Sequence, residues 1–300
     1  MPPLRMHPDE LDANAGLVGR LLAAQHPQWA HRALEPVDSA GTDHALYRLG
    51  ADMVVRLPRI PSAVAKVAKE HEWLPRIAPA LPLAVPEPLA AGRPGEGFPW
   101  PWSVYRWLEG ETVWSRRPDD EEDAGARLGR FVAALQAIDP AGGPPPGDHN
   151  SFRGEPLAGR DREVREAIPA LAGEIDTGAA TEVWEGALEA PVWRHPPRWL
   201  HGDLLPSNLL VRDGRLSAVI DFGCLGVGDP ACDLMAAWTV LTAAGRRPFR
   251  ELVATDDAAW ARGRGWALSQ AVIAIPYYRV TNPVLAGIGR RTVAEVLGDA

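Results

Sequence analysis

The spacing of apolar positions predicts a helix at each end of the first quarter of the chain, with short strands between them. Apolar residues recur at helical intervals over residues 9–24 and again over 62–77. The first of these segments has three acidic residues in its predicted first turn: Asp9, Glu10 and Asp12. Over residues 31–60 the interval between apolar residues shortens to that of strands. A turn at Gly50, followed by a strand that ends at Pro58, predicts a hairpin.

After residue 77 the pattern is first extended and then mostly helical. The proline-rich segment 78–102 is too broken for a helix, and it leads into a β-branched and aromatic strand at 103–110. A helix with an acidic start is predicted within 118–140. Two weaker helices follow, at about 159–172 and 178–190.

The last third combines a small hairpin with helices. Three short apolar segments predict strands: 198–203, 208–211 and 216–223. Asp213-Gly214 predicts the turn that joins the last two. Helices are expected from Pro230 to the end of the chain, with breaks near Pro248 and Pro283. The chain therefore reads as an α+β protein with a β-rich part at 1–110 and a mostly helical part at 111–300.

Composition excludes several classes of protein. With 300 residues and 46% hydrophobic content the chain can bury a large core. It has no apolar run of the roughly 18–20 residues that a membrane span requires, nor a signal-like start, so we expect a cytoplasmic protein that binds no membrane. The net charge of −8 argues against nucleic-acid binding. The two cysteines, Cys224 and Cys232, are expected to be reduced.

The negative charge lies mainly in the helical part of the chain. Residues 1–110 carry 12 acidic and 11 basic side chains, whereas residues 111–300 carry 27 and 20. This excess indicates either an ordinary solvated surface or a cleft that attracts cations. Charge alone favours the first alternative.

A short polar motif, H-x-D-x4-N, occurs twice. The copy at residues 7–14 opens an amphipathic segment and has no strand before it. The other copy begins at His201, ends an apolar strand, and places Asp203 and Asn208 next to a hairpin that brings back Asp221. Phosphoryl transfer needs such a set, because one carboxylate orients the nucleophile while an amide oxygen and a second carboxylate hold magnesium. The alternative, a polar hairpin turn, does not explain why these positions are polar.

The segment HGDLLPSNLLV followed by VIDFGCLGVGDPACDLMAAW resembles the catalytic and metal segments of the aminoglycoside phosphotransferase family, the small-molecule branch of the protein-kinase-like fold. The resemblance extends from about Ser39 to Tyr278. It implies a two-lobed fold, with a nucleotide-binding N-terminal lobe at 1–110 and a helical C-terminal lobe at 111–300 that carries the catalytic hairpin and the acceptor site.

The resemblance also implies roles for residues of the hairpin. Asp203 corresponds to the catalytic base and His201 to the structural histidine of the catalytic loop. Asn208 and Asp221 correspond to the ligands of Mg²⁺. The segment with Asp229 and Asp233 corresponds to one that mainly supports this loop: GDPACDL.

The first third of the chain should then form the lobe that covers the bound ATP or GTP. Arg56 stands where the family has a lysine that holds the α and β phosphates, and Glu70 is its expected partner, with Glu72 less favoured. The only lysines, Lys66 and Lys69, fall in the following helix and cannot replace it in register. The remaining expected nucleotide contacts are Val54 against the base, Gly41 and Thr42 at the phosphates, and the interlobe segment Tyr105, Arg106, Trp107 and Leu108.

The sequence thus predicts an enzyme that moves the γ-phosphoryl group of ATP or GTP to a hydroxyl of a small molecule. The acidic C-terminal lobe favours an aminoglycoside or a similar cationic antibiotic, bound by residues within 155–190 and 255–280. A macrolide, or a metabolite such as an amino alcohol or ketosamine, is the alternative acceptor. A protein acceptor is not favoured, because GDPACDL follows DFG almost at once. Arg56 and the single glycine of the phosphate loop leave open a non-catalytic nucleotide-binding protein.

Overall fold

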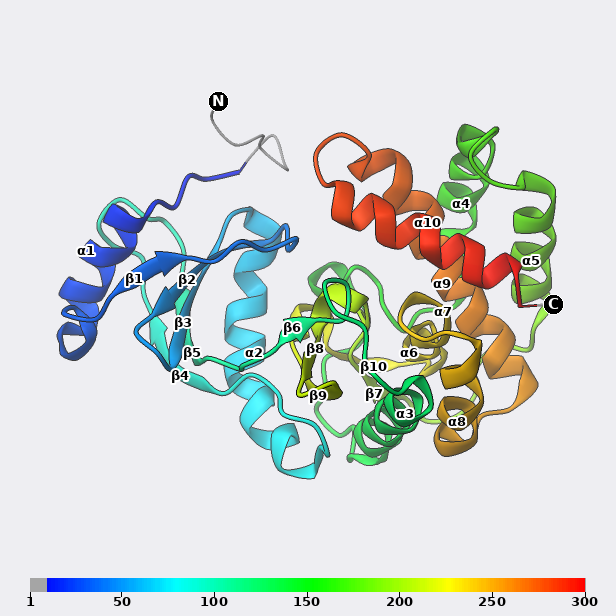
Figure 1. The fold of residues 1–300 in the computed structure, drawn as a ribbon, viewed down its shortest axis with the longest axis horizontal. Helices are drawn as coiled ribbons and strands as arrows, with labels where there is room; N and C mark the ends of the chain where they lie inside the picture. The colour runs from blue at the N-terminus through cyan, green and yellow to red at the C-terminus, as the bar shows by residue number, and fades with distance from the viewer. Residues whose placement is uncertain (1–9, 300) are drawn as a thin grey trace.

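A five-stranded antiparallel sheet lies beside a larger, mostly helical part of the molecule (Figure 1). The computed structural model describes residues 10–299. The strand order is β1-β2-β3-β5-β4. The strands are β1 (Leu34–Pro36), β2 (His44–Leu49), β3 (Met53–Pro58), β4 (Pro88–Gly92) and β5 (Trp102–Arg106). Helix α1 (Ala15–Gln25) covers one face of this sheet and α2 (Val64–Ile77) the other (Figure 1).

The alternation of side chains along β3 sorts them between the two faces. Met53, Val55 and Leu57 point into the small core under α1. Val54 faces the opposite side, where it joins the main core. Arg56 lies two positions further along on the same side as Val54, so the strand directs its guanidinium toward α2 and the helical part of the molecule.

The first helix is shorter than predicted. It begins at Ala15 and not at residue 9, because Asn14 acts as its N-cap and accepts a hydrogen bond from Leu17 N at 3.0 Å. Glu10 and Asp12 therefore precede the helix, and Asp9 lies outside the described residues. The predicted acidic first turn of α1 is wrong.

Small sheets and helices build the rest of the molecule around one large apolar core. The sheets pair β6 with β8 and β9, and β7 with β10. Their strands are β6 (Glu111–Thr112), β7 (Arg198–Leu200), β8 (Leu209–Arg212), β9 (Arg215–Val219) and β10 (Gly226–Gly228). The helices are α3 (Glu121–Ala137), α4 (Asp161–Ala167), α5 (Thr177–Glu189), α6 (Ala231–Leu234), α7 (Ala236–Thr239), α8 (Ala243–Val253), α9 (Asp257–Tyr278) and α10 (Pro283–Leu297).

Proline positions account for one correct and one incorrect helix boundary. Pro283 begins α10 after the N-cap Asn282, as the predicted break requires. Pro248 does not break a helix, because it lies in the second turn of α8, where only one intrahelical hydrogen bond is lost and α8 packs against α3. The chain instead leaves α8 at Ala254, which has a left-handed φ of 53°. None of the helices within residues 10–299 is long and apolar enough for a membrane span.

Candidate active site

The segment after β7 is held in place by a buried carboxylate. Asp233 of α6 accepts hydrogen bonds from the backbone N–H groups of His201 and Gly202, each at 2.7 Å. The His201 ring lies edge-on to Phe222, with ring centres 4.6 Å apart. Burial lowers the pKa of His201, so the ring is neutral, with Nε2 donating to the Ile220 carbonyl at 3.1 Å and Nδ1 accepting from Asp203 N at 3.1 Å. His201 therefore fixes the backbone on which Asp203 stands.

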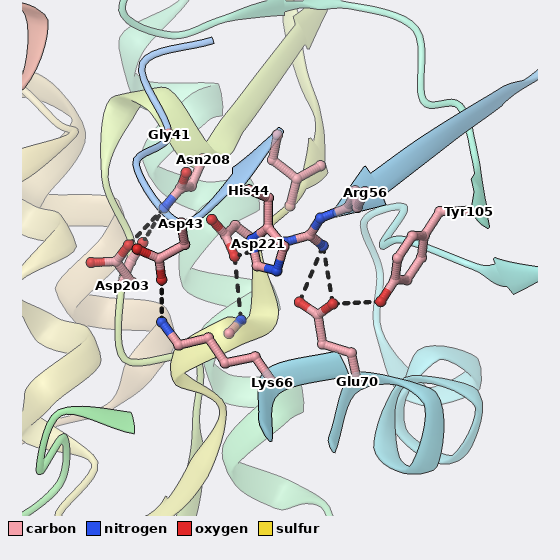
Figure 2. A network of polar contacts seen from close by, with 12 residues as sticks. Gly41, Asp43, His44, Arg56, Lys66, Glu70, Tyr105, Asp203, Asn208 and Asp221 are labelled. Carbon is pink, nitrogen blue, oxygen red and sulfur yellow. Dashed lines mark hydrogen bonds and ion pairs between the residues drawn. The ribbon is translucent and has the colours of Figure 1, made fainter. Parts of the chain in front are cut away.

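Asn208 connects this segment to the returning hairpin. Its Nδ2 donates to both the backbone oxygen and Oδ2 of Asp203, at 2.9 Å each. Its backbone oxygen accepts from Ile220 N at 2.8 Å, next to Asp221. The hairpin turn at Asp213-Gly214 has positive φ angles of 52° and 73°, as its sequence predicts. These contacts leave the amide oxygen of Asn208 available as an acceptor beside Asp221 (Figure 2).

Arg56 joins the sheet to the hairpin. Its NH1 donates to the Glu70 carboxylate of α2 at 3.0 Å, and its NH2 lies 3.3 Å from Asp221 Oδ1 (Figure 2). Tyr105 OH also donates to Glu70, at 2.5 Å. His44 Nδ1 lies 3.4 Å from Arg56 NH2, and burial together with the Arg56 charge lowers the His44 pKa to about 3. Arg56 is thus the cation, and His44 the neutral member, of a buried network.

The two site carboxylates have opposite pKa shifts. Burial would raise the pKa of Asp221, but the Arg56 cation, together with Lys66, holds it well below its usual range. Burial raises the pKa of Asp203 to about 6; Arg153 opposes this shift, and the negative charge of Asp221 adds to it. Asp221 is therefore permanently ionised, whereas Asp203 titrates near pH 6 and is mostly ionised at pH 7, a range that suits a general base.

Two adjoining cavities meet at these residues. The larger, of about 560 Å³, lies between the sheet and the α9–α10 turn. The smaller, of about 240 Å³, lies against α9 and α10. The residues that line both are Ala40, Gly41, Asp43, Ser207, Asn208 and Asp221. Asp203 lines only the smaller cavity and Arg56 only the larger, so these two side chains lie on opposite sides of the shared wall.

The structure brings most of the predicted nucleotide contacts to the larger cavity. Its lining includes Gly41, Val54, Arg56, Tyr105, Arg106, Trp107 and Leu108. Thr42 lines the smaller cavity, and Glu70 lines neither but fixes Arg56. Of the interlobe N–H groups, Arg106 N donates to Glu87 O at 2.9 Å and Trp107 N to Asp52 O at 2.8 Å. Within residues 10–299 the Leu108 N–H has no partner, which makes it the available interlobe donor.

Several residues at the site were not expected from the sequence. Lys66 lines the smaller cavity and pairs with Asp43 (Figure 2). Arg153 donates from Nε to Gly202 O at 2.9 Å. Helix α10 supplies part of the cavity wall, whereas no residue of 155–190 lines it. Lys66 lies four positions before Glu70, so both side chains are on the same face of the predicted helix. This spacing was the signal in the sequence that could have indicated Lys66.

The α9–α10 turn reaches the loop after β1. Asn282 Nδ2 donates to Ala40 O at 2.8 Å, while its Oδ1 accepts from Leu285 N at 3.1 Å and caps α10. Ala40 and Asn282 both line the larger cavity, so its wall is closed by a contact between residues 242 positions apart.

The donor atoms fit a magnesium ion that also binds phosphate. Asn208 offers an amide oxygen and Asp221 an ionised carboxylate, which are ligands that Mg²⁺ prefers. Residues 10–299 contain no group of three or more acidic, histidine or cysteine side chains placed to hold a metal by themselves. The pair thus suits an ion that obtains its remaining oxygens from water and nucleotide.

Similar solved structures define the fold. The GDP and kanamycin complex of APH(2")-IIia has a TM-score of 0.72 at 20% identity, over 94% of this chain and 98% of that one. The macrolide 2'-phosphotransferase MphH from Brachybacterium faecium, an apoenzyme, has a TM-score of 0.62 at 24% identity, over 96% and 99%. ADP-bound APH(2'')-Ib has a TM-score of 0.57 at 18% identity, over 95% and 97%. The predicted two-lobed, protein-kinase-like α+β fold is therefore confirmed.

The sequence places the chain within one family of this fold. Residues 33–266 match the model of the phosphotransferase enzyme family, APH. The match covers most of the chain, and the protein belongs to this family. The chain has no significant match among curated protein sequences.

Proposed function

We propose that the protein transfers the γ-phosphoryl group of ATP or GTP to a hydroxyl of a small molecule. The observation that carries this proposal is the position of Asn208 and Asp221 in the wall shared by two cavities, with Asp203 on the side of the smaller one. The larger cavity is the proposed nucleotide site, and the smaller one the proposed acceptor site. Residues 1–110 are the proposed nucleotide lobe and 111–300 the proposed catalytic and acceptor lobe.

The proposed reaction is an in-line displacement. The acceptor oxygen forms a bond to the γ-phosphorus while the bond to the β–γ bridging oxygen breaks, and the electron pair leaves with the nucleoside diphosphate. Asp203 accepts the hydroxyl proton. Arg56, fixed by Glu70, binds the α and β phosphates. Asn208 and Asp221 hold Mg²⁺, which when bound offsets the negative charge of the phosphates.

The walls of the smaller cavity bear on the class of acceptor. Its α9 and α10 residues are Gln270, Ala271, Ala274, Tyr278, Leu285, Ile288, Gly289 and Thr292. None is acidic, and the nearby Glu174 is paired with Arg279 at 3.1 Å and Arg290 at 3.3 Å. A polycationic aminoglycoside would lack carboxylate partners on this wall. The α9–α10 wall therefore favours a hydroxylated acceptor of the macrolide type over the aminoglycoside that the charge of the lobe suggested, while the carboxylates of the cavity, Asp43, Asp203 and Asp221, lie on its other side.

Turnover with a panel of acceptors tests the proposal. Purified protein is incubated with Mg²⁺, ATP or GTP, and an aminoglycoside, a macrolide or an amino alcohol, and nucleoside diphosphate release is measured. We expect stimulation by at least one acceptor, most strongly by the macrolide. Mg²⁺-dependent nucleotide binding without stimulation by any of them would instead support the non-catalytic alternative.

Two substitutions assign the carboxylates. Asp203→Ala should reduce transfer by about 10²–10⁴-fold while nucleotide affinity stays nearly unchanged, because Asp203 acts on the acceptor. Asp221→Ala should weaken Mg²⁺-dependent nucleotide binding in titration calorimetry. Asp213→Asn is the matched control, since this carboxylate lies in the same hairpin with 91% of its side chain exposed. Wild-type turnover in both alanine variants would mean that the site lies elsewhere.

A further inference from the structure

Phosphoryl transfer between the two cavities would be favoured by a side-chain cation on the acceptor side of their shared wall, in addition to the Mg²⁺ that Asn208 and Asp221 would hold. The transferred group carries negative charge on its equatorial oxygens. Arg56 lines only the larger cavity, where it is committed to Glu70 and Asp221. The loop 201–208, HGDLLPSN, contains no lysine or arginine. The cation that meets the moving group must therefore come from another element.

Lys66 is placed to supply this charge. It lies in α2 one turn before Glu70, so the helix directs both side chains to the site. The Lys66 side chain is 11% exposed and lines the smaller cavity together with Asp203. Burial opposes its charge, but the Cys224, Asp43 and Asp221 groups raise its pKa well above the usual value. Lys66 is therefore a permanent cation on the acceptor side.

The present partner of Lys66 is a residue of the phosphate loop. Asp43 follows Gly41 and Thr42, and its carboxylate forms an ion pair with the Lys66 ammonium (Figure 2). Asp43 lines both cavities, so its carboxylate lies where the two meet. A carboxylate at that position repels a triphosphate. It also gives the Lys66 ammonium the kind of anionic oxygen that a phosphoryl group offers.

Arg153, the other cation that lines the smaller cavity, is held by different contacts. Arg153 donates Nε to Gly202 O at 2.9 Å, and its guanidinium lies 5.7 Å from the centre of the Trp266 ring. It is thus anchored to the backbone of the catalytic loop. Within residues 10–299 Lys66 donates no hydrogen bond to the backbone of that loop, and its ammonium pairs with the Asp43 side chain.

We propose that Lys66 is a catalytic residue that binds the γ-phosphoryl group as it crosses between the cavities, and that Asp43 takes the place of this group in the free enzyme. The inference rests on the proposed phosphotransferase function. The exchange of Asp43 for a phosphoryl oxygen makes and breaks no covalent bond, and the Lys66 proton stays in place. Arg56 then binds the phosphates that remain on the nucleotide, and Lys66 binds the phosphoryl group that is transferred.

Binding of di- and triphosphates tests this inference without any acceptor. Dissociation constants for ADP or GDP, and for the non-hydrolysable analogue AMP-PNP or GMP-PNP, are measured by calorimetry with Mg²⁺. Lys66→Gln should weaken binding of the triphosphate analogue by roughly tenfold or more, because a charge-assisted contact is lost, and should leave the diphosphate within about twofold. Lys66→Arg should recover most of the loss. Asp43→Asn should tighten binding of the triphosphate analogue only.

Arg76→Gln is the matched control, since Arg76 lies in the same helix, 59% exposed and paired with Glu72. It should change neither constant. An unchanged ratio of the two constants in Lys66→Gln and Asp43→Asn overturns the role of Lys66; if Lys66→Gln does not fold, Lys66→Arg and Asp43→Asn decide. A wild-type protein that binds neither nucleotide overturns the proposed function itself, so the two failures are distinguishable.

Discussion

At the scale of single residues, the environment of Asp203 determines when it can act as a base. Burial and the charge of Asp221 raise its pKa to about 6, and the Arg153 cation limits this rise. A base with a pKa of about 6 is mostly ionised at pH 7 and becomes protonated as the pH falls below 6. The sign of the effect is therefore a loss of activity in acid.

This environment predicts an acid limb in the pH profile and a way to move it. The value of kcat/KM for the best acceptor of the panel should fall about tenfold per pH unit below about pH 6. Arg153→Gln removes the cation that favours the ionised form, so the limb should move to higher pH. The measurement is kcat/KM from pH 5 to 9, with the exposed Arg165→Gln as control. A limb that stays in place in Arg153→Gln contradicts this assignment.

The candidate site shows which residues can be predicted from sequence and which cannot. The strand before His201 and the hairpin turn at Asp213 fix the separation of Asp203 and Asp221, because both are local features. The other H-x-D-x4-N copy has the same spacing, yet its Asn14 is a helix cap. The role of Lys66 depends on how α2 packs against residues more than a hundred positions away, which no local pattern specifies.

At the scale of elements, a helix that local signals specify is predicted correctly, whereas a strand that depends on long-range pairing is not. Helix α3 begins where its acidic segment predicts, with Asp120 accepting from Asp123 N at 3.0 Å as the N-cap. Strand β4 lies inside the proline-rich segment 78–102, where no local pattern indicated a strand. It forms because β5 offers a partner edge, and β5 follows only after the connection 93–101. Pairing of this kind is decided by the rest of the sheet.

Close packing of α3 on α8 depends on a glycine. A Cβ added to Gly125 would lie 2.1 Å from Gly245 O, which is backbone and cannot move aside. Gly125→Ala should therefore lower the free energy of unfolding by about 1–3 kcal/mol, measured by urea denaturation. Gly186→Ala in α5 is the matched control, because a Cβ there meets nothing within 4 Å and should stabilise the helix by about 0.5–1 kcal/mol. Equal effects of the two substitutions would contradict the packing argument.

At the scale of the whole molecule, the contact between Asn282 and Ala40 joins the turn between α9 and α10 to the proposed phosphate loop. Ala40 precedes Gly41, and Asn282 begins the helix that lines the smaller cavity. Asn282→Asp keeps the N-cap oxygen but loses the donor to Ala40 O. Nucleotide release should become about 2- to 10-fold faster, because one hydrogen bond holding the loop is lost.

Stopped-flow release of a fluorescent nucleotide measures this effect. Asn14→Asp is the matched control, since Asn14 is also an N-cap but lies on α1, which is not part of either cavity. Its release rate should equal that of the wild type. Release that is equally fast in both variants, or unchanged in Asn282→Asp, would show that the contact does not retain the nucleotide.

The scarcity of lysine has a practical consequence for the molecule. Its 31 basic side chains include only two lysines; both lie in α2, where Lys66 lines the smaller cavity and Lys69 is buried behind it against Gly223 O. Burial and the nearby charge of Lys66 lower the pKa of Lys69 to about 8, so near neutral pH a fraction of Lys69 is an uncharged amine. Apart from the α-amino group of the chain, an amine-selective reagent thus has no target on the outer surface. Covalent labelling followed by mass spectrometry would report on how far the smaller cavity and the packing of α2 against Gly223 expose these two amines.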